Sequence, residues 1–287
     1  MRPRSRGTVA MSDEEESAME ELQGRVAVVT GAGSGIGRGI ADALADAGAR
    51  LVIADIEGRA AEAVAAAIRD AGHPAIARHV DVTDGDDIES LAEATIEAFG
   101  AVHVLVNNAG VMTMGPLADA TEADWNWLFE VNVHGMVRGV RAFLPHLRAN
   151  APAHIVKTVS MAPVAPRLDG EMGIYTASKG AAIGFSEVLR AELADEEIGV
   201  TAVCPGPVAT RLYEADRNRH ARFGGRTGME APARAHRQQP DEVGAMVVDG
   251  ILRNAGYVFT DLESRGRIEA REARIREALD DLEQGGA

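Results

Sequence analysis

Cysteine, aromatic residues and long apolar runs are all scarce in this sequence of 287 residues. The single cysteine, Cys204, cannot form an intrachain disulfide, and a metal site built on several cysteines is excluded. Aromatic residues make up only 4% of the chain, so Ala, Val, Ile and Leu must build the core. No apolar run approaches the roughly 18 residues that a membrane-spanning helix requires. We therefore expect a cytoplasmic protein that lacks disulfides and does not enter a membrane.

Positive charge is also in short supply. Lys and Arg number 29 against 44 Asp and Glu, which leaves a formal net charge of -15. A general nucleic-acid binder needs clustered basic residues to neutralise phosphates, so this class of protein is disfavoured. No group of His, Asp and Glu has metal-ligand spacing, and we expect no metal site.

Residues 1–22 differ in composition from the rest of the chain. They contain three arginines and the acidic run Asp13 to Glu16, but no apolar stretch like the core of a signal peptide. Such a segment cannot bury a core, so we expect a disordered N-terminal extension over 1–22. The length of the remaining chain suits one α/β domain over 23–287.

From residue 25 onward, short apolar runs alternate with alanine-rich stretches of helical periodicity. The apolar runs predict seven strands, at about 25–33, 49–55, 75–82, 102–110, 154–160, 199–206 and 257–260. The periodic stretches predict helices at about 35–48, 59–70, 84–99, 122–149, 173–196, 241–253 and 263–283, the fourth of them interrupted near Gly135 or Pro145. Residues 207–240 form a predicted loop. This alternation indicates a single-domain Rossmann fold of the α/β class, a doubly wound parallel sheet of about seven strands with helices on both faces.

A glycine-rich turn joins the first predicted strand to the first predicted helix. It reads Thr30-Gly31-Ala32-Gly33-Ser34-Gly35-Ile36-Gly37. Glycines let the backbone turn tightly and approach a pyrophosphate, whose charge is stabilised by the N-terminus of the following helix. The turn therefore predicts a dinucleotide-binding site, with contacts from Gly31, Ser34, Gly35, Ile36 and Gly37.

Asp55 stands at the end of the second predicted strand, 18 residues after Gly37. A carboxylate there can accept hydrogen bonds from the hydroxyls of the adenosine ribose, and it repels a 2′-phosphate. NAD is therefore the predicted cofactor in preference to NADP. Two alternatives stay open, because Arg38 or Arg59 could approach a 2′-phosphate and Asp55 could cap the following helix.

Tyr175 and Lys179 are four residues apart in a predicted helix, so their side chains share one face. A tyrosine hydroxyl, with a pKa of about 10, is a poor base at neutral pH. A neighbouring ammonium and the positive ring of an oxidised nicotinamide both favour the phenolate, and we expect a lowered pKa for Tyr175. Tyr175 would then take the proton of an alcohol while a hydride leaves for the ring.

Four motifs in register resemble the short-chain dehydrogenase/reductase family over about residues 24–260. They are the TGxxxGxG pattern at 30–37, Asn107-Asn108-Ala109-Gly110, Tyr175-Thr176-Ala177-Ser178-Lys179 and Pro205-Gly206. The segments 205–223 and 256–261 are similar to a bacterial branch that includes NAD-dependent Cα-dehydrogenases of lignin-type aryl ethers. The resemblance implies an NAD-dependent oxidoreductase that interconverts a secondary alcohol and a ketone. It also implies a homodimer or homotetramer assembled through the two long helices.

The resemblance assigns roles to individual residues. Ser160, at the end of the fifth strand, would hydrogen-bond the substrate oxygen, and its distance in sequence from Tyr175 implies an insertion of about two residues within 161–173. Asn132 would support a water relay behind Lys179. The other implied cofactor contacts are Asp81 and Val82 at the adenine, Asn107, Asn108, Ala109 and Gly110 along the floor, Pro205, Gly206 and Val208 near the nicotinamide, and Thr210 beside the pyrophosphate.

Apolar residues around these positions indicate a hydrophobic or aromatic substrate. The candidate lining residues are Met112, Met114, those of 161–172, Leu212 and Tyr213. Residues 211–237 carry seven arginines against three acids, so this loop either attracts an anionic substrate or is simply solvated. A reductase of steroid-like or β-ketoacyl substrates is an alternative within the class, and a non-catalytic NAD-sensing protein is an alternative outside it. The presence of Ser160, Tyr175 and Lys179 together favours an enzyme.

Overall fold

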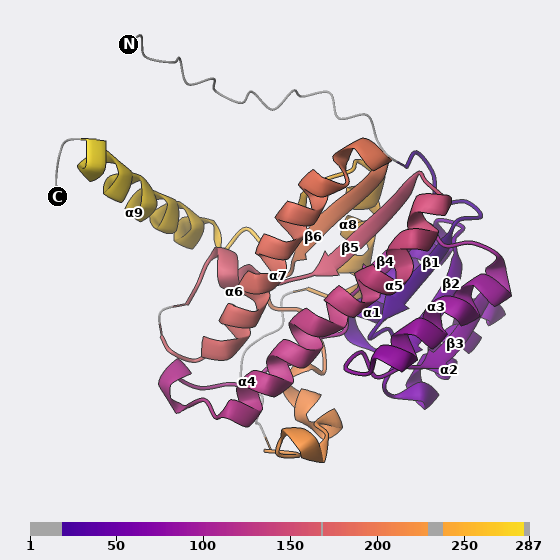
Figure 1. Ribbon diagram of the computed structural model, residues 1–287, viewed down its shortest axis with the longest axis horizontal. Helices are drawn as coiled ribbons and strands as arrows, with labels where there is room; N and C mark the ends of the chain where they lie inside the picture. The colour runs from indigo at the N-terminus through magenta and orange to yellow at the C-terminus, as the bar shows by residue number, and fades with distance from the viewer. Residues whose placement is uncertain (1–18, 168, 229–237, 284–287) are drawn as a thin grey trace, which may run out of the picture.

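A seven-stranded parallel sheet forms the centre of the computed structural model, which describes residues 19–167, 169–228 and 238–283 (Figure 1). Its strands follow the order β3-β2-β1-β4-β5-β6-β7, and all neighbouring pairs are parallel. The strands are β1 (Val26–Thr30), β2 (Arg50–Asp55), β3 (Ala75–His79), β4 (Val104–Asn107), β5 (Ala153–Thr158), β6 (Ile198–Cys204) and β7 (Tyr257–Phe259). The strands β1 to β3 extend from the centre of the sheet to one edge, and β4 to β7 extend from the centre to the other edge. The order of the strands therefore reverses at the boundary between β1 and β4. This doubly wound order confirms the fold class expected from the sequence.

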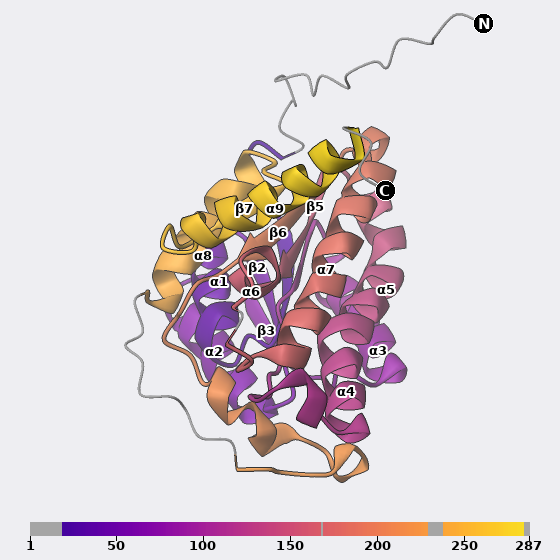
Figure 2. The same cartoon turned by 90° about the vertical axis from the view of Figure 1, so that its left-hand side faces the viewer.

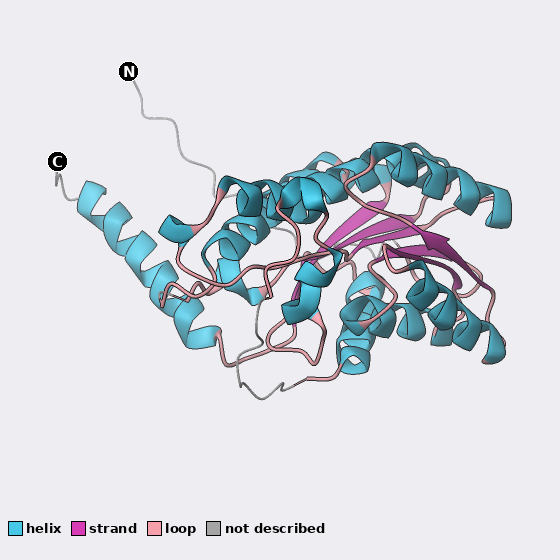
Figure 3. Ribbon diagram, turned by 90° about the horizontal axis from the view of Figure 1, so that it is seen from below, coloured by secondary structure: helices cyan, strands magenta, loops and turns pink. Residues whose placement is uncertain are grey.

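Helices cover both faces of the sheet (Figure 3). One face carries α1 (Gly35–Asp46), α2 (Gly58–Asp70) and α8 (Pro240–Leu252), and the other carries α3 (Gly85–Phe99), α5 (Gly135–Ala149) and α7 (Gly173–Glu192). Alternate residues of β1 enter the two core layers, with Ala27 and Val29 packing on one face and Val28 on the other. Because both faces are covered, the central strands β1 and β4 are apolar along most of their length, which explains their short continuous apolar runs.

Several short elements connect these layers or extend from them. They are η1 (Leu117–Asp119), α4 (Glu122–Phe129), η2 (Glu130–His134), α6 (Met161–Val164), η3 (Ala194–Glu196), η4 (Leu212–Asn218), η5 (Ala221–Phe223) and α9 (Arg265–Glu283). The sequence did not predict α6 or the elements within the loop that begins at residue 207. In the part of the chain that the structure describes, no helix is both long and apolar enough to cross a membrane.

The predicted long helix over 122–149 is interrupted only once. A π-helical turn, η2, separates α4 from α5 immediately before Gly135, which is one of the two positions where the sequence predicted an interruption. The other candidate position, Pro145, lies inside α5 and does not interrupt it. Its ring is exposed on the helix surface, where water can hydrogen-bond the carbonyl that lacks an N–H partner.

The folded domain begins earlier in the chain than the sequence indicated. Met19 is fully buried and Leu22 is nearly so, and both belong to the core cluster beneath α1, α2 and α8. The predicted extension over 1–22 is therefore too long by at least four residues. Its first part, residues 1–18, lies outside the described residues. Two isolated apolar side chains in a polar segment show no periodicity, so only the packed structure reveals their burial.

Truncation at the two boundaries is expected to give different stabilities. Removal of residues 1–18 should leave the unfolding midpoint unchanged, whereas removal of 1–22 should lower the free energy of unfolding by at least about 2 kcal/mol, because two buried apolar side chains leave the core. Urea unfolding of both truncated chains beside the full chain measures this difference. Identical midpoints for all three would show that Met19 and Leu22 contribute nothing to the fold.

Candidate active site

A cavity of about 560 Å³ opens at the carboxyl ends of the central strands. It runs from the glycine-rich turn after β1 to Tyr175 on α7, and it contains nearly all of the residues that the sequence singled out. Of those residues, Gly31, Ser34, Gly35, Ile36, Gly37, Asp55, Asp81, Val82, Asn108, Ala109, Gly110, Ser160, Tyr175, Lys179, Pro205, Gly206, Val208 and Thr210 line it. Asn107 and Asn132 do not. This is the edge of a doubly wound sheet where ligands bind.

Two glycines in the turn between β1 and α1, Gly31 and Gly37, lie where a side chain would collide with neighbouring atoms. Gly31 has a φ of +64°, and a Cβ placed on Gly37 would lie 2.3 Å from the carbonyl oxygen of Gly31 and 2.4 Å from Nδ2 of Asn108. Ser34 precedes α1 but makes no side-chain cap, and the first turn of α1 contains no acidic residue. The first amides of α1 and the Ser34 hydroxyl therefore face the cavity without an anionic partner, which fits a bound diphosphate.

Asp55 lies beside this turn at the end of β2. Its Oδ2 accepts a hydrogen bond from the amide of Gly33 at 2.8 Å, and its Oδ1 accepts one from the amide of Glu57 at 2.8 Å. The carboxylate therefore orders the glycine-rich turn and the start of α2, and each oxygen keeps acceptor capacity toward the cavity. Neither Arg38 nor Arg59 lines the cavity, and Arg38 pairs with Asp42. The arginine alternative raised by the sequence gains no support from these positions.

The two asparagines that follow β4 point in different directions. Asn108 donates from Nδ2 to the carbonyl oxygens of Thr30 and Gly31, at 2.9 and 3.1 Å, and accepts from the hydroxyl of Thr158 at 3.1 Å. It therefore joins β1, β4 and β5 beneath the cavity. Asn107 faces α5, since a Cβ on Gly139 would lie 2.3 Å from its Oδ1. Successive strand residues face opposite sides of a sheet, so Asn107 cannot line the floor as the resemblance implied.

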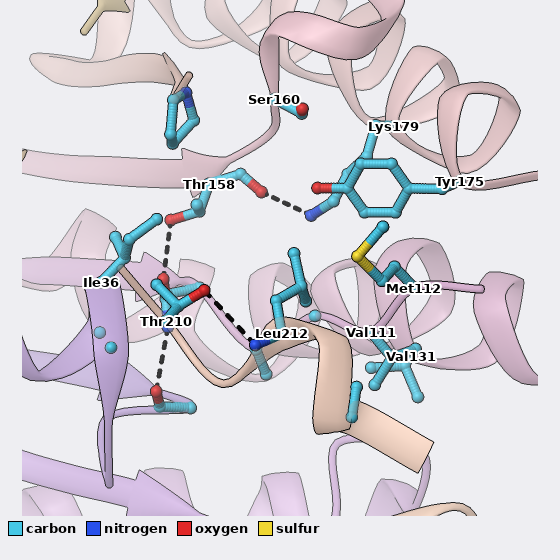
Figure 4. Close-up of a pocket in the computed structure, with 18 of the residues that line it drawn as sticks. Ile36, Val111, Met112, Val131, Thr158, Ser160, Tyr175, Lys179, Thr210 and Leu212 are labelled. Carbon is cyan, nitrogen blue, oxygen red and sulfur yellow. Dashed lines mark hydrogen bonds between the residues drawn. The ribbon is translucent and has the colours of Figure 1, made fainter. Parts of the chain in front are cut away.

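Tyr175 and Lys179 lie one turn apart on α7, and both are buried (Figure 4). The ammonium of Lys179 donates to the carbonyl oxygen of Thr158 at 2.8 Å and lies 5.9 Å from the centre of the Tyr175 ring. Ser160 follows β5, where its Oγ accepts from the amide of Ala162 at 3.1 Å, and it lines the same cavity as Tyr175. The helix α6, which starts at Ser160, occupies the region where the sequence implied an insertion.

Burial controls the protonation of this pair. Burial raises the pKa of Tyr175 to about 12, although the hydrogen bond with Ser160 acts in the opposite direction. Burial also lowers the pKa of Lys179 to about 8. The lowered tyrosine pKa expected from the sequence is therefore absent in the protein alone, because the loss of solvation outweighs the lowering effect of Ser160. At neutral pH Tyr175 holds its proton and can donate it.

Asn132 occupies the π-helical turn behind this pair. Its Oδ1 accepts from the amide of Val111 at 2.8 Å, and its Nδ2 donates to the carbonyl oxygen of Val111 at 2.9 Å and to the hydroxyl of Ser178 at 3.0 Å. A Cβ on Gly110 would lie between Nζ of Lys179, at 3.2 Å, and Oδ1 of Asn132, at 3.3 Å. Asn132 is thus placed behind Lys179, where the predicted water relay would run; the relay itself stays a prediction.

The substrate end of the cavity is apolar. Met112, Leu212 and Tyr213 line it as the sequence predicted, and so do Met161 and Met172 from the predicted segment 161–172. Met114 lies in a separate, smaller depression. Among the lining residues that the sequence missed are Trp127, Ala215 and Phe223, because Trp127 stands on α4 and the other two stand in a loop without periodicity.

Residues 211–223, which we call the strap, cross the mouth of the cavity between α2 and α4 (Figure 2). Arg217 donates to Glu57 from Nε at 2.9 Å and from Nη2 at 2.5 Å, and Asn218 donates to the same carboxylate at 3.1 Å. Burial raises the pKa of Glu57, but the hydrogen bonds from Asn218 and Arg217 together hold that pKa below its ordinary value. Glu57 is therefore ionised and attaches the strap beside Asp55.

Two further arginines attach the other end of the strap. Arg219 is buried, pairs with Asp124 of α4 at 2.6 Å and lies over the ring of Trp127 at 4.9 Å. Arg222 hydrogen-bonds Thr83 and lies 3.9 Å from Asp81. Of the seven arginines that the sequence assigned to an anionic substrate or to solvent, Arg217, Arg219 and Arg222 thus lie beside acids distant in the chain, and Arg234 and Arg237 lie outside the described residues. This arrangement favours neither of those alternatives.

Loss of the Arg219 anchor is expected to weaken substrate binding. Arg219→Met keeps the length of the side chain but leaves Asp124 without its partner, so the strap should loosen and KM for a neutral alcohol should rise at least about tenfold. Steady-state kinetics at two ionic strengths measure the effect. Arg226→Met is the control, because the side chain of Arg226 is 70% exposed. A KM that stays unchanged in Arg219→Met would contradict the anchoring role.

Comparison with known proteins agrees with this geometry. Residues 25–221 match the short chain dehydrogenase family. Over 266 residues the chain is 30% identical to the Cα-dehydrogenase of Sphingobium sp. strain SYK-6, covering 88% of this chain and 85% of that protein. It is 33% identical over 267 residues to 1-deoxy-11-beta-hydroxypentalenate dehydrogenase of Streptomyces exfoliatus, covering 91% and 89%.

Solved structures show the same relationship. A short-chain dehydrogenase/reductase from Burkholderia phymatum in complex with NAD superposes with a TM-score of 0.78 at 34% identity, covering 93% of this chain and 96% of that one. A short chain dehydrogenase from Burkholderia cenocepacia in complex with NADP gives a TM-score of 0.72 at 32% identity, covering 85% and 99%. Within the described residues no cluster of three or more His, Cys, Asp or Glu could hold a metal ion. The chain belongs to the short-chain dehydrogenase/reductase family of NAD(P)-dependent oxidoreductases.

Proposed function

We propose that this protein interconverts a secondary alcohol and a ketone with NAD as cofactor, and that its substrate is hydrophobic or aromatic. The observation that carries the proposal is the buried group formed by Ser160, Tyr175 and Lys179 at the apolar end of the cavity. When bound, the cofactor supplies or accepts a hydride and, in its oxidised form, brings a positive ring charge. The first amides of α1, the Ser34 hydroxyl and Asp55 would hold its diphosphate and adenosine ribose.

The protein residues hold the substrate oxygen and move one proton. Oγ of Ser160 would donate a hydrogen bond to that oxygen, and Oη of Tyr175 would exchange a proton with it. In the reductive direction the protonated Tyr175 donates this proton to the developing alkoxide. In the oxidative direction Tyr175 must first lose its proton, and the ammonium of Lys179 stabilises the phenolate that results. The apolar walls from Met112, Trp127 and Phe223 exclude water around the reacting carbon.

Cofactor choice follows from the acidic adenosine end. Asp55 lines the cavity there, and its carboxylate would repel a 2′-phosphate. We expect kcat/KM with NAD to exceed that with NADP at least tenfold, or about 1.4 kcal/mol. Asp55→Asn keeps an acceptor for the amide of Gly33 but removes the negative charge of the carboxylate. It should therefore lower the ratio of kcat/KM with NAD to kcat/KM with NADP. Equal efficiencies with the two cofactors in the unaltered protein would count against the role of Asp55.

The substrate is best identified with a panel of secondary alcohols. Aryl alcohols, cyclic terpenoid alcohols, steroid-like alcohols and β-hydroxyacyl thioesters would be mixed with NAD, and absorbance of the reduced cofactor followed. The flexible thioether side chains of Met112, Met161 and Met172 suit a bulky apolar substrate. Turnover restricted to steroid-like or β-hydroxyacyl compounds would favour the alternative reductase. Tight NAD binding without turnover of any alcohol or of the matching ketones would favour the NAD-sensing class.

We also propose a cytoplasmic homodimer or homotetramer that contacts its copies through α5 and α7. Both helices are long and lie side by side on the same face of the sheet, and α7 presents Val188 to solvent. Light scattering of the purified protein tests the assembly, and a monomer at micromolar concentration would contradict it. The cytoplasmic assignment rests on the single buried cysteine, Cys204.

A further inference from the structure

Helix α9 leaves the body of the protein after its second turn (Figures 1 and 3). Its first turns are attached to α6, because Arg267 donates to the carbonyl oxygen of Ala165 at 3.2 Å and Arg271 donates to that of Pro163 at 3.0 Å. Ile268 packs against the neighbouring core cluster. No residue of the helix is buried, and beyond Arg271 every side chain is exposed. The second half of α9 is thus an isolated helix in this single chain.

An apolar stripe runs along this exposed half. Ile275, Leu279 and Leu282 are 54%, 58% and 70% exposed, and they follow Ile268 at intervals of seven, four and three residues. These intervals place all four side chains on one face of the helix. The first of them, Ile268, is the one that packs against the body. The face that α9 uses for its own attachment therefore continues outward without a partner among the described residues.

The two halves of α9 carry charges of opposite sign. Residues 265–276 contain five arginines and two glutamates, whereas residues 277–283 contain four acids and no base. Two parallel copies of such a helix would place like charges side by side along their length. Two antiparallel copies place the basic half of each helix beside the acidic half of the other, which is complementary. The surface is therefore complementary to itself under a two-fold rotation.

We propose that α9 pairs antiparallel with α9 of a second copy of this chain, with Ile275 near the two-fold axis. In this register Ile268 faces Leu282 of the second copy, so the apolar stripe is covered along its whole length. Glu272 faces Arg276 of the second copy on the flank of the stripe. Arg265 and Glu283 of opposite copies meet at the ends of the overlap. This contact uses a different surface from α5 and α7, so it does not depend on the assembly proposed above.

Disulfide trapping tests the pairing directly, because the chain has one native cysteine and it is buried. Ile275→Cys should give a covalent dimer on mild oxidation at low micromolar concentration, since the two thiols meet at the axis. Glu277→Cys is the matched control: it is equally exposed on the same helix but lies on the opposite face from the stripe. Leu282→Cys should not link to itself, because antiparallel pairing separates the two copies of this position by about 20 Å.

A charge exchange tests the register. Arg276→Glu places two glutamates together and should reduce the trapped dimer of the Ile275→Cys protein at least severalfold, and addition of Glu272→Arg should restore it. Equal trapping at 275 and 277, no trapping at 275, or trapping at 282 as strong as at 275 would overturn the proposal. Light scattering of the same samples separates it from the assembly through α5 and α7. An oligomer without α9 trapping would leave that assembly intact and reject the α9 contact alone.

Discussion

Replacement of Tyr175 by phenylalanine is expected to lower kcat roughly 10²- to 10⁴-fold while cofactor affinity stays the same. The substitution keeps the buried ring and removes only the hydroxyl that faces the cavity beside Ser160. No other acid or base among the described residues is buried beside the reacting oxygen in a position to exchange its proton, since Lys179 donates to Thr158. The glycine-rich turn and Asp55 are untouched. Steady-state kinetics together with titration calorimetry of NAD binding measure the two effects separately.

Tyr213→Phe provides the matched control, because Tyr213 also lines the cavity but lies on the strap. It should retain most of the activity. The pH dependence adds a second check: since burial raises the pKa of Tyr175 to about 12, alcohol oxidation should accelerate as pH rises, and Lys179→Ala should move the profile further upward. Near wild-type turnover by Tyr175→Phe would mean that the proton leaves by another route.

Lys157→Met is expected to stabilise the fold at pH 7 by on the order of 4 kcal/mol. Lys157 is one of only two lysines in the chain and is buried on β5, with its ammonium 4.6 Å from the centre of the Phe185 ring. Within the described residues its Nζ has no hydrogen-bond partner. Burial lowers its pKa from 10.5 to about 7, so its charged form is strongly disfavoured in the folded state. Methionine has a similar length and packs well against an aromatic ring.

The sign of the pH dependence identifies the cause. Between pH 7 and about 10.5 the unfolded chain binds a proton at Lys157 that the folded protein lacks, so the free energy of unfolding of the native protein should rise with pH. The rise for this one group is at most about 1.4 kcal/mol per pH unit. Lys179 adds a rise of the same sign only above about pH 8. Denaturant unfolding between pH 7 and 8 of the native protein and of Lys157→Met isolates the first group.

A flatter profile and higher stability in Lys157→Met would support this account. Lower stability with an unchanged slope would contradict it, and would indicate that Lys157 makes a stabilising contact. Asn107 is the neighbour to examine in that case, because it lies opposite Lys157 in the β4–β5 register and its Nδ2 also has no partner among the described residues.

Local signals in the sequence were sufficient for the architecture. Short apolar runs and helical periodicity predicted all seven strands and the six longest helices of the sheet layers, because a strand buried on both faces is apolar along its length. The glycine-rich turn was predictable for a similar reason: the close contacts around Gly31 and Gly37 leave no room for side chains. Tyr175 and Lys179 were placed together because a helix brings residues four apart to one face.

Contacts between distant segments were not predictable in this way. The strap arginines looked like free positive charge until the fold brought Glu57, Asp81 and Asp124 beside them. Met19 and Leu22 looked like part of a polar extension, and only packing beneath α1 shows that they belong to the core. Pairing of this kind depends on three-dimensional proximity, and residues 95 to 160 positions apart leave no periodic pattern in a single sequence.

Protonation and side-chain direction also belonged to the tertiary structure. The sequence placed Tyr175 beside Lys179 but predicted a lowered pKa, and burial of the whole group reverses that shift. It placed Asn107 in a cofactor motif, and the pleat of β4 turns its side chain toward α5. The sequence by itself determined the fold and the family and supplied the candidate residues for the chemistry, because these follow from spacing along the chain. The tertiary structure decided which of those residues face the cavity and how they are charged, because solvation and direction exist only once the chain is packed.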